Sequence, residues 1–87
     1  MNTENNVFEL AAAAVKSLPE RPDDQTMLSL YALYKQGSSG DVQGDKPTLF
    51  DFVGSAKYSA WEKLKGTNEE DAREQYVALV RKLGGQV

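Results

Sequence analysis

Apolar residues in this chain recur every three or four positions, in four segments separated by proline or glycine. This spacing gathers apolar side chains on one face of an α-helix, whereas a half-buried strand requires strict alternation. Pro19 and Pro22 interrupt the first connection, glycines between Gly37 and Gly44 mark the second, and Gly66 marks the third. The pattern therefore predicts an all-α fold, a bundle of four helices without strands.

Residue types at the ends of these segments predict where each helix begins and ends. Thr3 is expected to cap the first helix, and Thr67 with Glu70 matches a capping box at the start of the fourth. Asp23 and Asp24 suit the positively polarised start of the second helix. The expected helices run from Thr3 or Glu4 to Leu18, from near Asp23 to near Gly37, from between Thr48 and Asp51 to before Gly66, and from after Thr67 to before Gly84.

The length of the chain bounds its organisation. Its 87 residues suffice for one domain with one modest core, which we expect to span residues 3–87. The first helix is rich in alanine, so another helix can approach it closely. The fourth helix is its natural partner, because Tyr76, Val77 and Val80 supply larger side chains there.

Composition removes most enzymatic chemistry from consideration. The chain has no cysteine and no histidine, and so lacks disulfides, thiolate catalysis, the commonest general base and most zinc sites. We therefore expect no catalytic residue, no metal site and no cofactor. A net charge of −3 argues against nucleic acid as a partner, because nucleic acid requires a basic face.

Stable membrane insertion and secretion are not expected either. No apolar run approaches the roughly 20 residues that a bilayer span requires. Residues 1–6 are mostly polar and lack the basic region of a signal peptide. The sequence thus predicts a cytoplasmic protein, which we expect to be a monomer.

Two tyrosines and a lysine share one face of the second helix. At 3.6 residues per turn, Tyr34 lies about 60° to one side of Tyr31 and Lys35 about 40° to the other. A flat aromatic surface beside a fixed positive charge suits a ligand with an aromatic base and phosphates. The alternative is structural, with both tyrosines half-buried in the core and the lysine extending to solvent.

Other lysines and a tyrosine border the same apolar surface. Lys16 lies between Ala12 and Val15 by helical angle, and Lys57 lies near the edge of the apolar face of the third helix. Both can also be plain solvated lysines, as we expect for Lys46, Lys63 and Lys65. Tyr76 is most simply a core residue whose hydroxyl can donate a hydrogen bond at the rim.

Two stretches have the composition of a ligand site without its spacing. The glycine-rich segment 37–44 is preceded by no strand and followed by no Gly-Lys-Ser/Thr, so we interpret it as a connector. The acidic cluster from Glu69 to Glu74 lacks the alternating spacing of an EF-hand loop. We interpret it as compensation of the dipole of the fourth helix.

From about Phe8 to Leu83 the sequence resembles the acyl-CoA-binding protein family. The residues that carry the resemblance are Tyr31, Tyr34, Lys35, Gln36, Gly40, Asp41, Pro47, Ala56, Lys57, Trp61, Lys65, Gly66, Glu70, Asp71, Ala72 and Tyr76. The resemblance implies an up-down-down-up four-helix bundle whose second helix is skewed across the others. It also implies reversible binding, buffering and transport of long-chain fatty acyl-CoA thioesters without chemical change.

The same resemblance implies a role for each site residue. Tyr31 stacks on or near the adenine, Lys35 holds the ribose 3′-phosphate, and Lys57 assists it. Tyr34 is the second tyrosine of the family motif, three residues after Tyr31. Lys16 and Tyr76 add polar contacts. The apolar groove for the acyl chain is lined by Phe8, Ala12, Met27 and Leu28.

Two departures from the family pattern concern the shape of this groove. Gly37 replaces the small alanine or serine that is usual after Gln36, and is expected to end the second helix early. Tyr58 stands where tryptophan is common, which leaves Trp61 as the one indole.

Two other functions stay open, a helical protein-interaction module with no lipid ligand and an acyl-CoA enzyme such as an isomerase. The enzyme hypothesis lacks an obvious catalytic residue, because the chain has no His or Cys.

Overall fold

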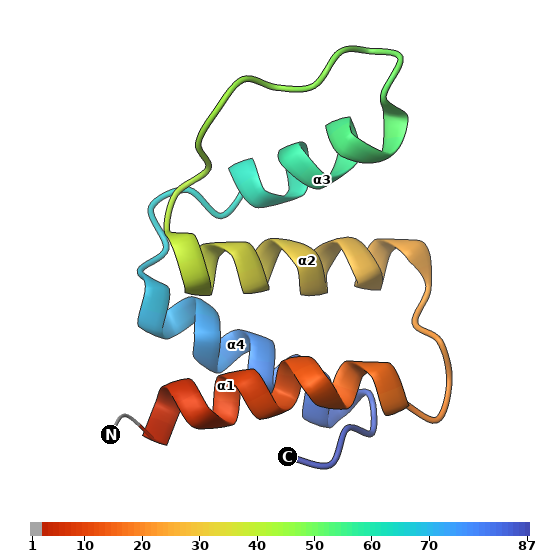
Figure 1. Cartoon of the computed structure of the whole chain (residues 1–87), viewed down its shortest axis with the longest axis vertical. Helices are drawn as coiled ribbons and strands as arrows, with labels where there is room; N and C mark the ends of the chain where they lie inside the picture. Colours follow the sequence, from red (N-terminus) through yellow and green to blue (C-terminus); the bar gives the residue numbers. More distant parts are fainter. Residues whose placement is uncertain (1–2) are drawn as a thin grey trace.

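The computed structural model describes residues 3–87, with side chains from Asn6 onward, and its regular structure over this range is helical (Figure 1). The elements are α1 (Thr3–Ala14), the 3₁₀ turn η1 (Val15–Ser17), α2 (Asp24–Ser39), α3 (Phe52–Glu62) and α4 (Glu69–Lys82). Helices α1 and α4 run in one direction and α2 and α3 in the other (Figure 1). The prediction of an all-α, up-down-down-up bundle is confirmed.

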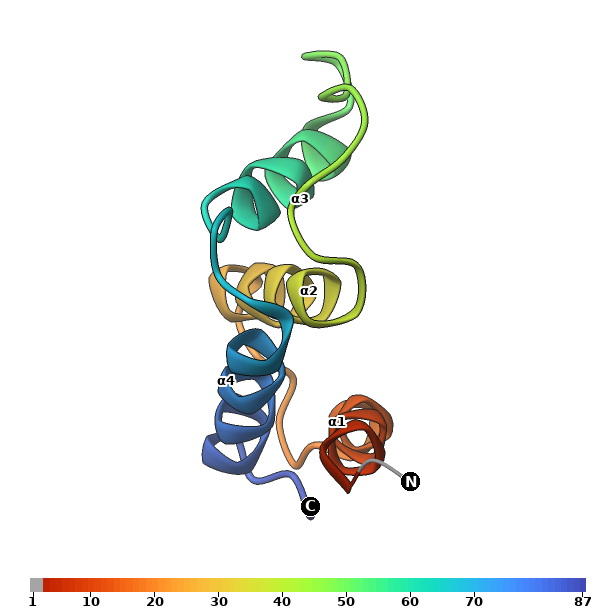
Figure 2. The ribbon, with the colours of Figure 1, turned by 90° about the vertical axis from the view of Figure 1, so that its left-hand side faces the viewer.

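Helix α2 is the central element of the bundle. It packs against α3 on one side and α4 on the other, and α1 packs against α4. Figure 2 views α1 and α2 almost end-on while α3 and α4 are inclined, so α2 is skewed relative to α3 and α4 but lies nearly along α1. Because α1 packs against α4, the predicted pairing of the first and fourth helices is correct.

The core lies where α1, α2 and α4 meet. Its buried members are Phe8, Ala11, Leu30, Leu33, Tyr76, Val77 and Val80. Ala11 and Val80 are completely buried, and the small Ala11 side chain permits the close approach of α4. Burial of an aliphatic side chain such as Val80 stabilises the fold by roughly 1.5–3 kcal/mol before entropy is counted.

Side chains close the starts of three helices, and one predicted cap is wrong. Asp23 caps α2 by accepting a hydrogen bond of 2.7 Å from the Thr26 amide. Helix α4 is capped by Asn68, whose side chain accepts from the Asp71 amide at 2.7 Å, and not by the predicted Thr67. The Thr67 carbonyl instead accepts from Gln36 Nε2 at 2.7 Å, so the chain turns into the helix one residue later. The predicted side-chain cap by Thr3 lies outside the described side chains.

The expectation that Gly37 ends the second helix is also wrong. Helix α2 continues to Ser39, and Gly40 ends it with a φ of 77°. A Cβ at Gly37 would lie 2.8 Å from Cγ of Arg73 and 3.2 Å from Cζ of Phe8. A side chain at position 37 would therefore force Arg73 to shift, because α2 approaches α4 closely there.

The connector between α2 and α3 is tied to the following loop through Asp41. Its carboxylate accepts hydrogen bonds from the Gly66 amide and from Nε2 of the buried Gln36, both at 2.9 Å. These two donors, with the charge of Lys65, hold the pKa of Asp41 below its ordinary value. The indole of Trp61 donates to the Gly40 carbonyl at 2.8 Å. The two loops thus fix α3 beside the end of α2.

Candidate functional site

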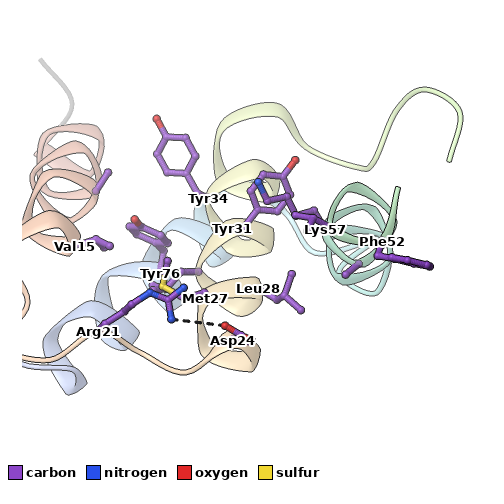
Figure 3. A pocket seen from close by; sticks show the side chains of 14 residues that line it. Val15, Arg21, Asp24, Met27, Leu28, Tyr31, Tyr34, Phe52, Lys57 and Tyr76 are labelled. Carbon is purple, nitrogen blue, oxygen red and sulfur yellow. Dashed lines mark ion pairs between the residues drawn. The ribbon is translucent and has the colours of Figure 1, made fainter. Parts of the chain in front are cut away.

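A cavity of about 720 Å³ opens between α1, α2 and α3 and reaches Tyr76 of α4 (Figure 3). Its wall is formed by Ala12, Val15, Arg21, Asp24, Met27, Leu28, Leu30, Tyr31, Tyr34, Phe52, Val53, Ala56, Lys57 and Tyr76. Every helix of the bundle contributes, so the cavity exists only in the folded chain. Among residues 6–87, whose side chains the structure describes, no cluster of three or more acidic side chains has the geometry to hold a metal ion.

Most of the wall is hydrocarbon. Ala12 and Val15 face the cavity from the first helical segment, Met27 and Leu28 from the start of α2, and Ala56 from α3. The i, i+3, i+4 spacing along α2 directs Met27, Leu28 and Tyr31 to one side of that helix. Such a wall accepts an alkyl chain, with roughly 0.8 kcal/mol gained for each methylene removed from water.

Three aromatic rings support the cavity where α1, α2 and α4 meet. Phe8 stacks on Tyr34, with ring centroids 5.0 Å apart and planes inclined by 18°. Phe8 also meets Tyr76 edge to face at 5.3 Å. Tyr34 and Tyr76 face the cavity, whereas Phe8 is only 3% exposed and packs behind them in the core.

The two tyrosines keep their phenol protons at neutral pH. Burial raises the pKa of Tyr76 to about 12, with smaller contributions from Tyr34 and Glu9. Burial also raises the pKa of Tyr34. Glu9 raises it further, since its carboxylate accepts a hydrogen bond from the Tyr34 hydroxyl at 3.3 Å. The Tyr34 proton is already donated to Glu9, whereas the Tyr76 hydroxyl is a donor next to the cavity.

A lysine lies over the aromatic edge of the cavity. Lys57 extends from α3 so that its Nζ lies 5.2 Å from the centre of the Tyr31 ring on α2 (Figure 3). This cation–π contact links the two helices and places a positive charge beside an aromatic face. The sequence placed Lys35 beside Tyr31, but in the structure the ammonium over the Tyr31 ring is that of Lys57.

A second cation in the wall comes from the connection between α1 and α2. Arg21 lines the cavity, and its Nη1 lies 3.6 Å from Oδ1 of Asp24 (Figure 3). Both side chains are largely exposed, so this ion pair contributes little to stability. The guanidinium therefore stays available to a ligand with anionic groups.

Lys35 and Lys16 occupy different places from Lys57. Nζ of Lys35 lies over the ring of Trp61, 4.9 Å from its centre, and the residue does not belong to the cavity wall. It follows Tyr31 by one helical turn on α2. Lys16 lies exposed on η1, next to Val15 but outside the wall.

The structure thus brings together seven of the ten predicted site residues. The wall includes Ala12, Met27, Leu28, Tyr31, Tyr34, Lys57 and Tyr76 and leaves out Phe8, Lys16 and Lys35. It also includes seven residues that were not among the predicted site residues, namely Val15, Arg21, Asp24, Leu30, Phe52, Val53 and Ala56. The four-residue spacing of Phe52 and Ala56, followed by Lys57, is the signal that could have revealed the contribution of α3.

Sequence and structure comparisons agree on the relatives of this chain. The family model described as Acyl CoA binding protein matches residues 5–80. Acyl-CoA-binding protein homolog 1 of Caenorhabditis elegans is 51% identical over 76 residues, which cover 87% of this chain and 88% of that protein. Acyl-CoA-binding protein of Saccharomyces cerevisiae is 46% identical over 79 residues, 91% of each chain.

Solved structures show the same architecture. The crystal structure of Oryza sativa Acyl-CoA-Binding Protein 2 superposes with a TM-score of 0.87 at 32% identity, covering 92% of this chain and 87% of that one. The solution structure of the yeast acyl coenzyme A binding protein gives a TM-score of 0.73 at 46% identity, covering 91% and 92%. The match of the family model over most of the chain, the identities and the shared fold lead to one assignment. This chain belongs to the acyl-CoA-binding protein family.

Proposed function

We propose that this protein binds long-chain fatty acyl-CoA thioesters reversibly, and buffers and transports them without changing them chemically. One observation carries the proposal. An apolar cavity is bordered by the Tyr31 ring with the Lys57 ammonium over it, so a single site combines surfaces for an alkyl chain, an aromatic base and an anion. Membership of the family supports the same ligand.

The acyl chain would occupy the hydrocarbon part of the cavity. Ala12, Met27 and Leu28 supply the predicted apolar contacts, and Val15 and Ala56 extend them. Phe8 supports this region from behind by fixing the Tyr34 ring. The protonated hydroxyl of Tyr76 is a donor that can meet the polar atoms next to the chain, whereas the hydroxyl of Tyr34 would first have to leave Glu9.

The nucleotide would lie at the aromatic edge. Stacking of the adenine on Tyr31 adds roughly 1–3 kcal/mol. Lys57 and Arg21 are the cationic residues of the cavity wall. Charge-assisted contacts from these side chains to phosphate are stronger than neutral hydrogen bonds. The proposed role of Lys35 at the 3′-phosphate requires its ammonium to leave the Trp61 ring, and Lys16 would act from outside the wall.

The same proposal includes several finer statements. The protein would act as one domain of residues 3–87, as a monomer, in the cytoplasm, without nucleic-acid partners and without turnover of its ligand. The absence of histidine and cysteine supports the last statement, because it removes the commonest base and the thiolate nucleophile. In residues 3–87, no helix is both long enough and apolar enough to cross a bilayer.

Calorimetric titration with palmitoyl-CoA, palmitate and free CoA tests the proposed ligand class. We expect palmitoyl-CoA to bind far more tightly than either fragment, because only the thioester occupies both the apolar and the cationic surface. Comparable affinity for palmitate would contradict the nucleotide role, and no binding of palmitoyl-CoA would favour a protein-interaction module. Recovery of intact thioester after incubation checks the absence of turnover, and loss in proportion to protein would support an enzyme.

A further inference from the structure

Four large apolar side chains project into solvent where the α2–α3 connector enters α3. The exposed fractions are 82% for Leu49, 92% for Phe50, 78% for Phe52 and 67% for Val53. A single exposed apolar residue is ordinary, but a contiguous group indicates an interaction surface. We call these four residues the apolar tip.

The apolar tip lies at one extremity of the molecule. The segment that leads into α3 is at one end of the longest axis, far from α1 and α4, in both views (Figures 1 and 2). Asp51, between the projecting residues, caps α3 by accepting a hydrogen bond of 2.9 Å from the Gly54 amide. The tip is therefore a protruding turn whose backbone is fixed by the helix cap.

The tip is continuous with the ligand cavity. Phe52 and Val53 belong both to the exposed tip and to the cavity wall, whereas Leu49 and Phe50 lie outside the wall (Figure 3). An apolar molecule that moves between the cavity and a surface touching the tip would stay in contact with hydrocarbon. This continuity indicates that the partner of the tip is the source or recipient of the alkyl chain.

The charge around the tip also restricts its partner. Residues 45–58 contain two acidic and two basic side chains, although the whole chain has a net charge of −3. The carboxylate of Asp51 is already used by the helix cap. A neutral, protruding apolar surface suits a zwitterionic lipid bilayer, into whose interface single side chains can insert.

We propose that the apolar tip docks on the surface of a lipid bilayer, so that the acyl chain passes directly between membrane and cavity. This inference rests on the proposed function, because a long-chain acyl-CoA is an amphiphile that partitions into bilayers. Docking would insert Leu49 and Phe50 into the bilayer interface and bring the Phe52 side of the cavity close to it. The helices would stay outside the hydrocarbon region.

Flotation of ligand-free protein with phosphatidylcholine vesicles tests the docking itself. We expect the wild-type protein to float with the vesicles, and the double variant L49S/F50S to do so at least about tenfold less. Both replaced side chains are exposed, so the variant should fold normally. Leu10→Ser is the matched control, because Leu10 is 61% exposed on α1 and outside the tip, and it should float like wild type.

Three results of the flotation would overturn the docking proposal. The first is no flotation of the wild type, and the second is equal flotation of wild type and L49S/F50S. The third is self-association of the wild type in analytical ultracentrifugation that the variant abolishes. That result would make the tip a contact between copies of this chain.

Uptake of palmitoyl-CoA from the same vesicles tests the consequence. In solution without vesicles, L49S/F50S should bind palmitoyl-CoA within about twofold of wild type, because neither residue lines the cavity. Its rate of uptake from vesicles should fall about tenfold. An unchanged rate would overturn the proposal. Failure of wild type to bind palmitoyl-CoA in solution would instead defeat the proposed function, while flotation of the ligand-free protein would still decide whether the tip docks.

Discussion

Lys57 offers a sharp test of the site, since it is a lysine of the cavity wall and lies over the Tyr31 ring. Lys57→Met removes the ammonium and retains an unbranched apolar stem. A hydrogen bond to a charged group contributes about 1.5–3 kcal/mol. Because Lys57 is exposed and salt screens its charge, we expect the lower end, a loss of about tenfold in affinity for palmitoyl-CoA.

The same substitution should affect stability only slightly. Loss of an exposed cation–π contact removes about 0.5–1 kcal/mol, which lowers Tm by a few degrees in a domain of this size. Titration calorimetry at 25 °C would therefore compare two folded proteins. Lys63→Met is the matched control, because Lys63 is exposed at the end of α3 and lies outside the cavity wall.

The affinities should also depend on salt in a defined way. The difference between wild type and Lys57→Met should shrink as sodium chloride is raised, because it arises from charge. A folded Lys57→Met protein with wild-type affinity would refute a contact between this ammonium and the ligand. An equal loss in Lys63→Met would attribute the effect to overall charge instead.

Four further outcomes are expected. In calorimetry, Lys35→Met should weaken binding of palmitoyl-CoA by about tenfold or more but leave binding of the dephospho-CoA ester unchanged. Equal losses of affinity for both esters would contradict a contact of Lys35 with the 3′-phosphate. Gly37→Ala should lower the free energy of unfolding in urea by about 1–3 kcal/mol, since its Cβ would lie 2.8 Å from Cγ of Arg73, and wild-type stability would contradict the close packing. The pKa of Asp41 is lower in the folded protein than its ordinary value of 3.8, so its carboxylate stabilises the fold at pH values above 3.8, and this stabilisation is lost as pH falls further. Asp41→Asn should therefore reduce the loss of stability at acid pH that is measured by urea unfolding. The pKa of Tyr76, raised to about 12, predicts a phenol that titrates above 10 in ultraviolet absorbance, with stability lost as pH rises from 10 to 12. Tyr76→Phe should reduce this loss of stability and leave the smaller part that comes from Tyr34, whose pKa is also raised.

The helices could be predicted from sequence because their signals are local. Apolar spacing, the Asp23 cap and the prolines between α1 and α2 all act within a few residues of the element that they define. The errors occurred where a distant contact decides. Thr67 and Asn68 are both suitable caps, and the hydrogen bond from Gln36 to the Thr67 carbonyl selects Asn68.

Gly37 shows the same limit for glycine. A glycine near the end of an apolar pattern is typical of a helix terminus. Here the deciding partner is Arg73, whose side chain packs against Gly37 and whose Nη1 donates to the Gly37 carbonyl at 2.9 Å. Nothing in the sequence around Gly37 indicates that this position contacts a residue of another helix.

The site could be predicted in part for a related reason. Tyr31 and Tyr34 share a helical face, so periodicity alone brings them together on α2. Arg21 was missed because it lies in the connection between two prolines, where no helical period assigns a direction. Lys35 was grouped with Tyr31 by helical angle, but its flexible side chain extends to Trp61 on α3.

Two lysine–aromatic contacts cross between α2 and α3 in opposite directions. Lys35 of α2 lies over Trp61 of α3, and Lys57 of α3 lies over Tyr31 of α2. Neither lysine forms an ion pair with a carboxylate among the side chains that the structure describes, those of residues 6–87. A cation–π contact at an exposed site contributes about 0.5–1 kcal/mol, less than a charge-assisted hydrogen bond to phosphate. Each ring therefore holds its ammonium group more weakly than a phosphate would, so an anion within reach of either lysine would displace the ring as its partner.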